Sequence, residues 1–198
     1  MRALRESDRG NNSLGTSRRP RGRILVSNSA THDSGSRWLG LSLGILIADR
    51  ASKFAIERNT SLFFRRPIFS DIVVLVHNQN PGIAFGVFSD SNSPWVGPLL
   101  LAGAAVMIAL LVWLLLAGRA GGALAQSGLA LILGGAAGNA LDRVIHGGVT
   151  DFLEVRLGTY IWPSFNLADS VITIGAALVL FELLFGARRR HRSSEKES

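Results

Sequence analysis

Two long segments without a charged residue constrain this sequence more than any other feature. Ser91–Gly118 holds 28 residues and Ala120–Leu141 holds 22. An α-helix rises about 1.5 Å per residue, so about 20 apolar residues cross a hydrocarbon core of about 30 Å. We therefore expect an integral membrane protein, with spans at about 94–117 and 126–145.

The net charge of +7 is concentrated at the two ends of the chain. Residues 1–37 carry +5 and residues 188–198 carry +3, whereas residues 38–187 carry −1. A folded surface for nucleic acid would need basic residues within the body, so this partition disfavours a nucleic-acid partner. Residues 1–37 are rich in Arg, Ser, Gly and Asn, and we expect a disordered basic tail there.

Two further spans are expected in the body, which makes four. One starts near Trp38 and ends at Lys53, and the other covers about 166–185. Between the first two spans, the β-branched run 72–76, the turn-rich run 78–82 and the apolar run 83–88 predict a small sheet. The expected fold class is membrane α-helical: four transmembrane helices with a small sheet outside the hydrocarbon.

Lysine and arginine near the span ends predict the orientation. The tails hold eight and five basic residues, which outnumber Arg58, Arg65 and Arg66 in the first loop. Both tails, 1–37 and 188–198, should therefore be cytoplasmic, and loops 59–93 and 147–165 should face the other side. The membrane domain between the tails is 38–187.

Several kinds of site are disfavoured by composition. The chain has no cysteine, which excludes disulfides, Cys-based metal sites and thiol nucleophiles. The body holds only His77 and His146, without an HExxH motif, so a zinc protease site is not expected. We expect neither a metal nor a cofactor.

Ionisable residues in membrane spans are costly and are candidates for function. Asp49 and Lys53 have i, i+4 spacing, which favours an ion pair on one helix face over a substrate role. Asp142-Arg143 closes the third span, and Arg143 would suit a buried carboxylate as its partner. The Gly134-x-x-x-Gly138 spacing predicts close approach of another helix.

Asp151 and Asp169 should both lie at the outer membrane boundary. If the two carboxyl groups meet, they cannot both ionise cheaply, and one should hold a proton at neutral pH. Such a pair can activate water and protonate a leaving amine, which is aspartic peptidase chemistry. Two separate interfacial helix caps explain the spacing equally well.

Two other functions deserve comparison. A small four-helix transporter could use Asp49, Asp142 and Asp169 as an ion path, but the second span is apolar throughout. Ser52-Lys53 could suggest a serine/lysine peptidase. Adjacent helical residues point about 100° apart, so this pair does not easily meet.

Four blocks in the body resemble lipoprotein signal peptidase (signal peptidase II). Asp49-x-x-Ser52-Lys53 is similar to the family's D-x-x-[ST]-K. Asn80-x-Gly82-x-Ala84-Phe85 is similar to N-x-G-x-A-F. The third block joins Gly138-Asn139-x-x-Asp142-Arg143 to Val149-x-Asp151-Phe152, and the fourth is Phe165-Asn166-x-Ala168-Asp169. Arg50 stands where many relatives have Gln, and Pro81 is unusual in its turn.

The resemblance implies an intramembrane aspartic endopeptidase with Asp151 and Asp169 as its catalytic pair. It implies that the site around them is shaped by Asn139, Asp142, Arg143 and Asn166, with Asp49 and Lys53 nearby, and that Asn80, Gly82 and Phe85 belong to an extracytoplasmic β-cradle. Segment 152–165 would form an amphipathic helix or flap.

The resemblance also implies the substrate and the place of the reaction. The substrate would be a prolipoprotein carrying diacylglycerol on a cysteine, cut just before that cysteine. The enzyme would lie in the bacterial cell (inner or plasma) membrane among lipids, as a multi-pass monomer without a cofactor, with its site near the extracytoplasmic face.

Reporter fusions can test the orientation. A fusion at Ser198 should report the cytoplasm, and one within Ser89–Ser93 should report the opposite side. Both reporters on one side of the membrane would contradict the number of spans.

Overall fold

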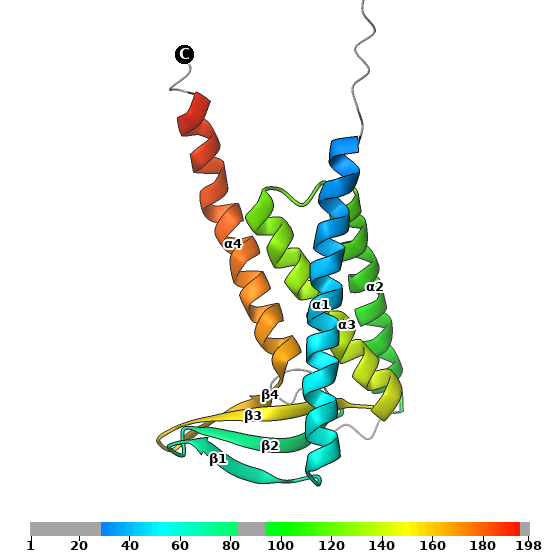
Figure 1. The fold of residues 1–198 in the computed structure, drawn as a ribbon, viewed down its shortest axis with the longest axis vertical. Coiled ribbons are helices and arrows are strands. Elements are labelled where there is room, and N and C mark those ends of the chain that lie inside the picture. Colours follow the sequence, from blue (N-terminus) through cyan, green and yellow to red (C-terminus); the bar gives the residue numbers. More distant parts are fainter. Residues whose placement is uncertain (1–28, 83–93, 195–198) are drawn as a thin grey trace, which may run out of the picture.

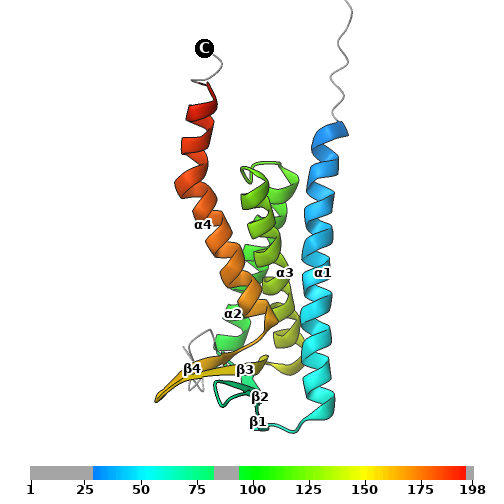
Figure 2. The ribbon, with the colours of Figure 1, turned by 60° about the vertical axis from the view of Figure 1, so that its left-hand side comes forward.

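The computed structural model describes residues 29–82 and 94–194. Four helices form a bundle, and a four-stranded sheet lies across one end of it (Figure 1). The beginning of the first helix and the end of the last lie at the opposite end of the bundle from the sheet (Figures 1 and 2). The elements in chain order are α1 (Ser29–Asn59), β1 (Arg65–Phe69), β2 (Val73–Asn80), α2 (Val96–Leu116), α3 (Ala123–His146), β3 (Val149–Leu157), β4 (Tyr160–Phe165) and α4 (Leu167–Ser194).

Three helices are long and apolar enough to cross a membrane. These are α2, α3 and the Leu167–Gly186 part of α4, with mean hydropathies of 2.8, 1.3 and 2.0. The second, third and fourth expected spans are therefore helices of the right length and composition. Helix α1 begins at Ser29, before the start expected near Trp38, and its charged residues keep it outside this group.

Helix α3 is the centre of the bundle and packs against the other three helices. Half of its span is buried within the protein, compared with 11% for α2 and 17% for α4. Large side chains of α2, such as Leu99, Val106 and Trp113, are instead exposed, as expected for a surface that faces lipid. Helix α3 is therefore the buried helix around which the others are arranged.

Glycines on two faces of α3 allow this close packing. A Cβ on Gly134 would lie 2.6 Å from the Ser42 carbonyl oxygen of α1, and one on Gly135 would lie 2.7 Å from the Ala168 carbonyl oxygen of α4. A Cβ on Gly138 would collide with the Asp49 carboxylate. The helix approach predicted from the Gly134 and Gly138 spacing is confirmed, and the neighbour is α1.

The sheet has the order β1-β2-β3-β4, and every neighbouring pair is antiparallel. Strand β2 confirms the expected strand around 72–76 and extends it to Asn80. The expected apolar strand 83–88 lies outside the described residues. The β1–β2 turn places Ser70 and Asp71 at φ 41° and 56°, as in a type I′ hairpin turn.

Of the two forms expected for 152–165, an amphipathic helix or a flap, the helix is wrong. This segment is a hairpin in which β3 and β4 turn at Gly158, whose φ is +62°. Its sequence is rich in β-branched and aromatic residues, which favour strands, and β3 pairs with β2 over Val73–Asn80. Pairing with a strand about 75 residues earlier in the sequence outweighs any local helical tendency.

Substitution of Gly134 by Ala tests the packing of α1 on α3. The added methyl group meets backbone atoms of Ser42 that cannot rotate away, so we expect a loss of about 1–3 kcal/mol in the free energy of unfolding. Gly103→Ala on α2 is the matched control, since nothing lies within 4 Å of its Cβ. Thermal unfolding in detergent should show a lower Tm for Gly134→Ala only, and equal Tm values would contradict the packing.

Candidate active site

The start of α4 is fixed by a reciprocal pair of hydrogen bonds. The backbone N–H of Asp169 donates to Asn166 Oδ1 (3.0 Å), and the backbone N–H of Asn166 donates to Asp169 Oδ2 (3.3 Å). This is the geometry of a capping box, in which residues at the two ends of the first turn satisfy each other's free N–H groups. The block Asn166-x-Ala168-Asp169 is therefore a helix start.

Asn166 also bonds to the other candidate acid. Its side-chain Nδ2 donates to Asp151 Oδ1 at 2.8 Å. Asn139 of α3 donates from Nδ2 to Asp169 Oδ1 at 2.9 Å. The two carboxyl groups are thus bound to the same asparagine, so the structure brings Asp151 and Asp169 into one site, and the interpretation as two separate caps is wrong. Asp169 does cap α4 through Oδ2, but its other oxygen, Oδ1, accepts the hydrogen bond from Asn139.

Burial changes the acidity of Asp151. Its side chain is 2% exposed. Burial, together with the negative charge of Asp169, raises the pKa of Asp151 from its ordinary value of 3.8 to about 7, although hydrogen bonds from Asn166 and Asn80 act in the opposite direction. A neutral Asp151 at moderately acid pH follows, beside a second carboxyl group.

The chain after β2 closes one side of the site. Asn80 Nδ2 donates to Asp151 Oδ2 (3.3 Å), and Asn80 Oδ1 accepts the Gly82 N–H (2.9 Å), which folds the backbone back on itself. Arg143 Nη2 donates to the Gly82 carbonyl oxygen at 2.9 Å. Asn80, Gly82 and Arg143 are therefore brought together with the two acids. Phe85 lies outside the described residues.

Arg143 does not have the partner that the sequence suggested. Within the described part of the chain its guanidinium donates to the carbonyls of Gly82 and Asn139 and forms no ion pair with a carboxylate. Its Nε is buried and has no hydrogen-bond partner among these residues. The neighbouring Asp142 carboxylate is paired with Arg50 and Lys53 of α1.

Lys53 lies at the centre of a second, fully buried cluster. Its Nζ is 2.7 Å from Asp49 Oδ2, 3.2 Å from Asp142 Oδ2 and 2.9 Å from Asn139 Oδ1. All three charged side chains are 0% exposed. Asp49 Oδ1 accepts the N–H of Ala168 at 2.9 Å. The predicted ion pair between Asp49 and Lys53 is confirmed, and the cluster connects α1, α3 and α4.

Three residues of this region were not among the expected site residues. Arg50 donates to Glu57 and to Asp142, and Thr150 donates to both of these carboxylates. Glu57 follows Asp49 and Lys53 on the same helix face at steps of four, and this spacing could have identified it. Nothing local in the sequence indicates Thr150, because its partners depend on where β3 begins.

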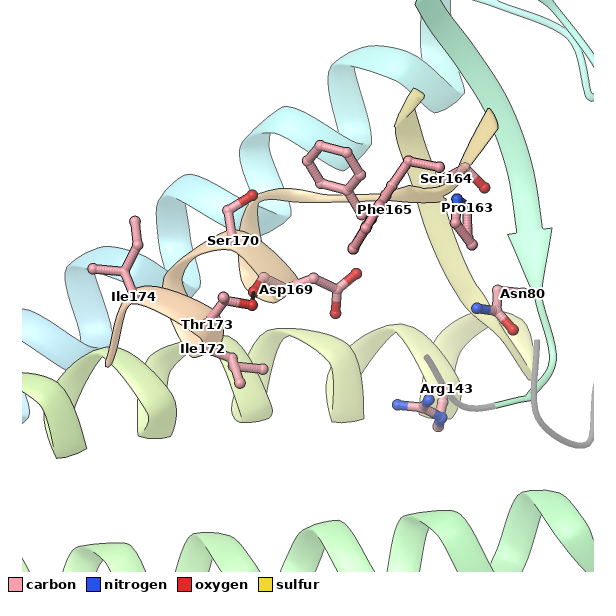
Figure 3. Close-up of a pocket in the computed structure, with 11 residues that line it drawn as sticks. Asn80, Arg143, Pro163, Ser164, Phe165, Asp169, Ser170, Ile172, Thr173 and Ile174 are labelled. Carbon is pink, nitrogen blue, oxygen red and sulfur yellow. Dashed lines mark hydrogen bonds between the residues drawn. The ribbon is translucent and has the colours of Figure 1, made fainter. Parts of the chain in front are cut away.

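A cavity of about 430 Å³ opens beside Asp169 between β4, α3 and α4 (Figure 3). Asp169, Arg143 and Asn80 form its polar end, and the Asp169 carboxylate points toward the interior. Its remaining walls are mostly apolar and come from β4 and α4: Trp162, Pro163, Ser164, Phe165, Ser170, Ile172, Thr173 and Ile174. The cavity therefore combines mostly apolar walls with one polar end, as is usual for sites that bind small molecules or peptide segments.

Other site chemistries find little support. The Ser52 hydroxyl donates to the Asp49 carbonyl at 2.7 Å, and Lys53 bonds elsewhere, so they do not form a nucleophile and base. Glu57, Asp142 and His146 could together hold a metal ion. The Arg50 guanidinium already donates to both carboxylates and supplies the positive charge there.

Solved structures identify the class of fold. A structure described as a bacterial membrane enzyme, determined by the in meso method at 2.3 Å resolution, matches with a TM-score of 0.67 and 25% identity. The match covers 75% of this chain and 88% of that one. A second, described in the same words at 1.9 Å resolution, shares the fold at 23% identity and a TM-score of 0.67, over 75% and 93% of the two chains. The fold is that of a membrane enzyme.

Sequence comparison identifies the family. The family model described as signal peptidase (SPase) II matches residues 41–185. The lipoprotein signal peptidase of Solibacter usitatus is 43% identical over 153 residues, 75% of this chain and 92% of the relative. That of Paraburkholderia phytofirmans is 36% identical over 167 residues, 84% and 92% of the two chains. The chain belongs to the signal peptidase II family and is a membrane protease of lipoprotein processing.

The raised pKa of Asp151 should make stability depend on pH. Between pH 3.8 and about 7 the folded protein holds a proton that the unfolded chain has released, so stability falls as pH rises through this window and levels off above it. Asp151→Asn should remove most of this slope in Tm measured in detergent. Infrared spectra should show a protonated carboxyl band that disappears near pH 7 in the wild type. Identical slopes for both proteins would contradict the assignment.

Proposed function

We propose that this enzyme removes the signal peptide from diacylglyceryl-modified prolipoproteins by cutting just before the lipidated cysteine, with Asp151 and Asp169 as its catalytic pair. The observation that carries the proposal is the sharing of Asn166 by these two carboxyl groups, of which Asp169 lines an apolar cavity. Family membership supports prolipoproteins as substrates.

The two acids take different roles in the proposed reaction. Asp151, whose pKa is raised to about 7, holds the proton, and Asp169 acts as the base. Asp169 removes a proton from a water molecule, whose oxygen attacks the scissile carbonyl carbon. The C–N bond then breaks, and Asp151 transfers its proton to the leaving amine of the cysteine. The proton from water remains on Asp169, so one proton is present on the pair before and after.

The neighbouring residues orient this pair. Asn166 and Asn80 donate to Asp151, and Asn139 donates to Asp169, which fixes each carboxyl plane. Asn139 is itself held by Lys53. Arg143 lies on the cavity wall, and in this proposal its guanidinium donates to a carbonyl group of the substrate. Such preorganised donors stabilise charge that develops during amide hydrolysis.

The cavity matches the chemistry of the substrate. Trp162, Phe165, Ile172 and Ile174 offer apolar walls next to Asp169. A lipid-modified peptide resides in the bilayer, so its scissile bond reaches the protein at the membrane boundary. In this proposal the apolar walls bind the part of the substrate that enters from the membrane, and the polar end receives the peptide bond.

The membrane arrangement is part of the same proposal. Helix α1 crosses as a fourth span, since its central charges are buried and paired within the bundle. Four crossings agree with the start of α1 and the end of α4 lying at one end (Figure 1). Both termini are then cytoplasmic, the sheet and the acids lie on the extracytoplasmic side of the bacterial cell membrane, and the basic residues at the two ends of the chain are attracted to anionic lipid. The unit is a monomer.

Asparagine substitutions test the catalytic pair. Asp151→Asn and Asp169→Asn should each lower kcat by at least about a thousandfold, because each removes a group that must gain or lose a proton. The measurement is cleavage of a synthetic diacylglyceryl prolipoprotein by purified enzyme in detergent. Asp71→Asn is the matched control, because Asp71 is exposed in the β1–β2 turn and Asn tolerates its positive φ.

Folding of the variants has to be shown separately. Asp169 belongs to the capping box of α4, so its substitution should also lower the free energy of unfolding by about 0.5–2 kcal/mol. Tm values and membrane insertion separate this loss from the loss of chemistry. Turnover near the wild-type rate in either folded variant would overturn the proposed pair.

A further inference from the structure

Thr150 is the point at which strand β3 is attached to two helices. Its backbone N–H donates to Asp142 Oδ2 of α3 at 3.0 Å, and its hydroxyl donates to Glu57 Oε1 of α1 at 3.0 Å. The residue is 0% exposed. Asp151 follows it directly, so one peptide unit separates this attachment from a proposed catalytic acid.

Arg50 fixes both acceptors. Its Nη1 donates to Asp142 Oδ1 at 2.7 Å and to Glu57 Oε1 at 3.0 Å, and its Nη2 donates to Glu57 Oε2. Hydrogen bonds to ionised groups are stronger than those between neutral groups, and a guanidinium that grips a carboxylate with two nitrogens also fixes its plane. The two carboxylates that accept from Thr150 are therefore held in place by Arg50 independently of β3.

The carboxylates of Glu57 and Asp142 could also belong to a metal site. His146 Nε2 lies 3.9 Å from Glu57 Oε2, and His146 Nδ1 lies 3.9 Å from Asp142 Oδ1. The three side chains are therefore close enough to form a set of metal ligands. Arg50, however, already donates to both carboxylates, and a cation placed there would have to displace it. The contacts therefore favour a structural task, which is to fix the start of β3.

We propose that Arg50, Glu57 and Thr150 are positioning residues for Asp151. This inference rests on the proposed function, in which Asp151 is catalytic. The Asp151 side chain is held by Asn166 and Asn80. Its backbone is held by the pairing of β3 with β2 and, through Thr150, by the helices. If the Thr150 contact is lost, the start of β3 can shift while the helices keep their places. A misplacement of about 1 Å at a reacting group can lower the rate by up to about a hundredfold.

Thr150→Val and Thr150→Ser make the first comparison. Valine keeps the shape and the backbone N–H but removes the donor to Glu57, so kcat should fall about tenfold with little change in KM, since no substrate contact is lost. Serine keeps the hydroxyl and should restore most of kcat. Thr60→Val is the matched control, because its hydroxyl also connects the end of α1 to the sheet, 3.0 Å from His77 Nδ1, without touching this cluster.

A double-mutant cycle shows whether the hydrogen bond itself carries the effect. Glu57→Ala and Thr150→Val each remove it, so the double variant should lose no more of kcat than Glu57→Ala alone. All rates are measured on purified, inserted enzyme with the synthetic diacylglyceryl prolipoprotein. If Glu57→Ala fails to insert, the comparison of the valine and serine variants at Thr150 decides alone.

The outcomes separate this inference from the proposed function. If Asp151→Asn is inactive but Thr150→Val keeps the wild-type kcat, or loses it together with Thr60→Val, the positioning role is overturned and the catalytic pair stands. Equal losses in the serine and valine variants overturn it as well. If Asp151→Asn remains active, the proposed function fails and the positioning role fails with it.

Discussion

The rest of the structure depends on the buried contacts of the Lys53 ammonium group. It is fully buried among Asp49, Asp142 and Asn139, where an unpaired charge would be costly, and it joins the first helix to the third. Breaking a buried ion pair from one side typically costs about 3–5 kcal/mol, because the partner charge remains without compensation. Through the second oxygen of Asp49, the same cluster fixes the N-terminus of α4, and through Asn139 it reaches Asp169. The geometry of the site is therefore set by the packing of the bundle.

Polar residues here serve the fold and the site together. Asn166 begins a helix and also donates to Asp151, and Asp169 completes the capping box while facing the cavity. A polar group in a membrane domain is costly unless it is satisfied, so each one tends to have several partners. As a result, a substitution in this region changes both stability and activity, and measurements of the two are needed together.

The sequence predicted those features that depend on local patterns. Uncharged runs identified helices α2 and α3, glycine spacing predicted the close approach of another helix to α3, and i, i+4 spacing identified the pair of Asp49 with Lys53. Features that depend on distant pairing were not predicted by these local patterns. The hairpin formed by β3 and β4 needs β2 as a neighbour, and Arg143 donates to the carbonyls of Gly82 and Asn139 instead of to a buried carboxylate. The contacts of Thr150 could not be predicted because they depend on the position and register of β3.

The i, i+4 spacing of Asp49 and Lys53 also bears on how the protein is made. Asn139, which completes the coordination of Lys53, is synthesised 86 residues after it. During that interval α1 would carry its charges without the other helices, in surroundings that penalise isolated ions. Because the acid and the base lie on one face of a single helix, they can neutralise each other as soon as that helix forms. In the proposed arrangement, where α1 is a fourth span, the first helix can thus enter the bilayer early in translation with this pair already formed, before the segments that complete the site are made.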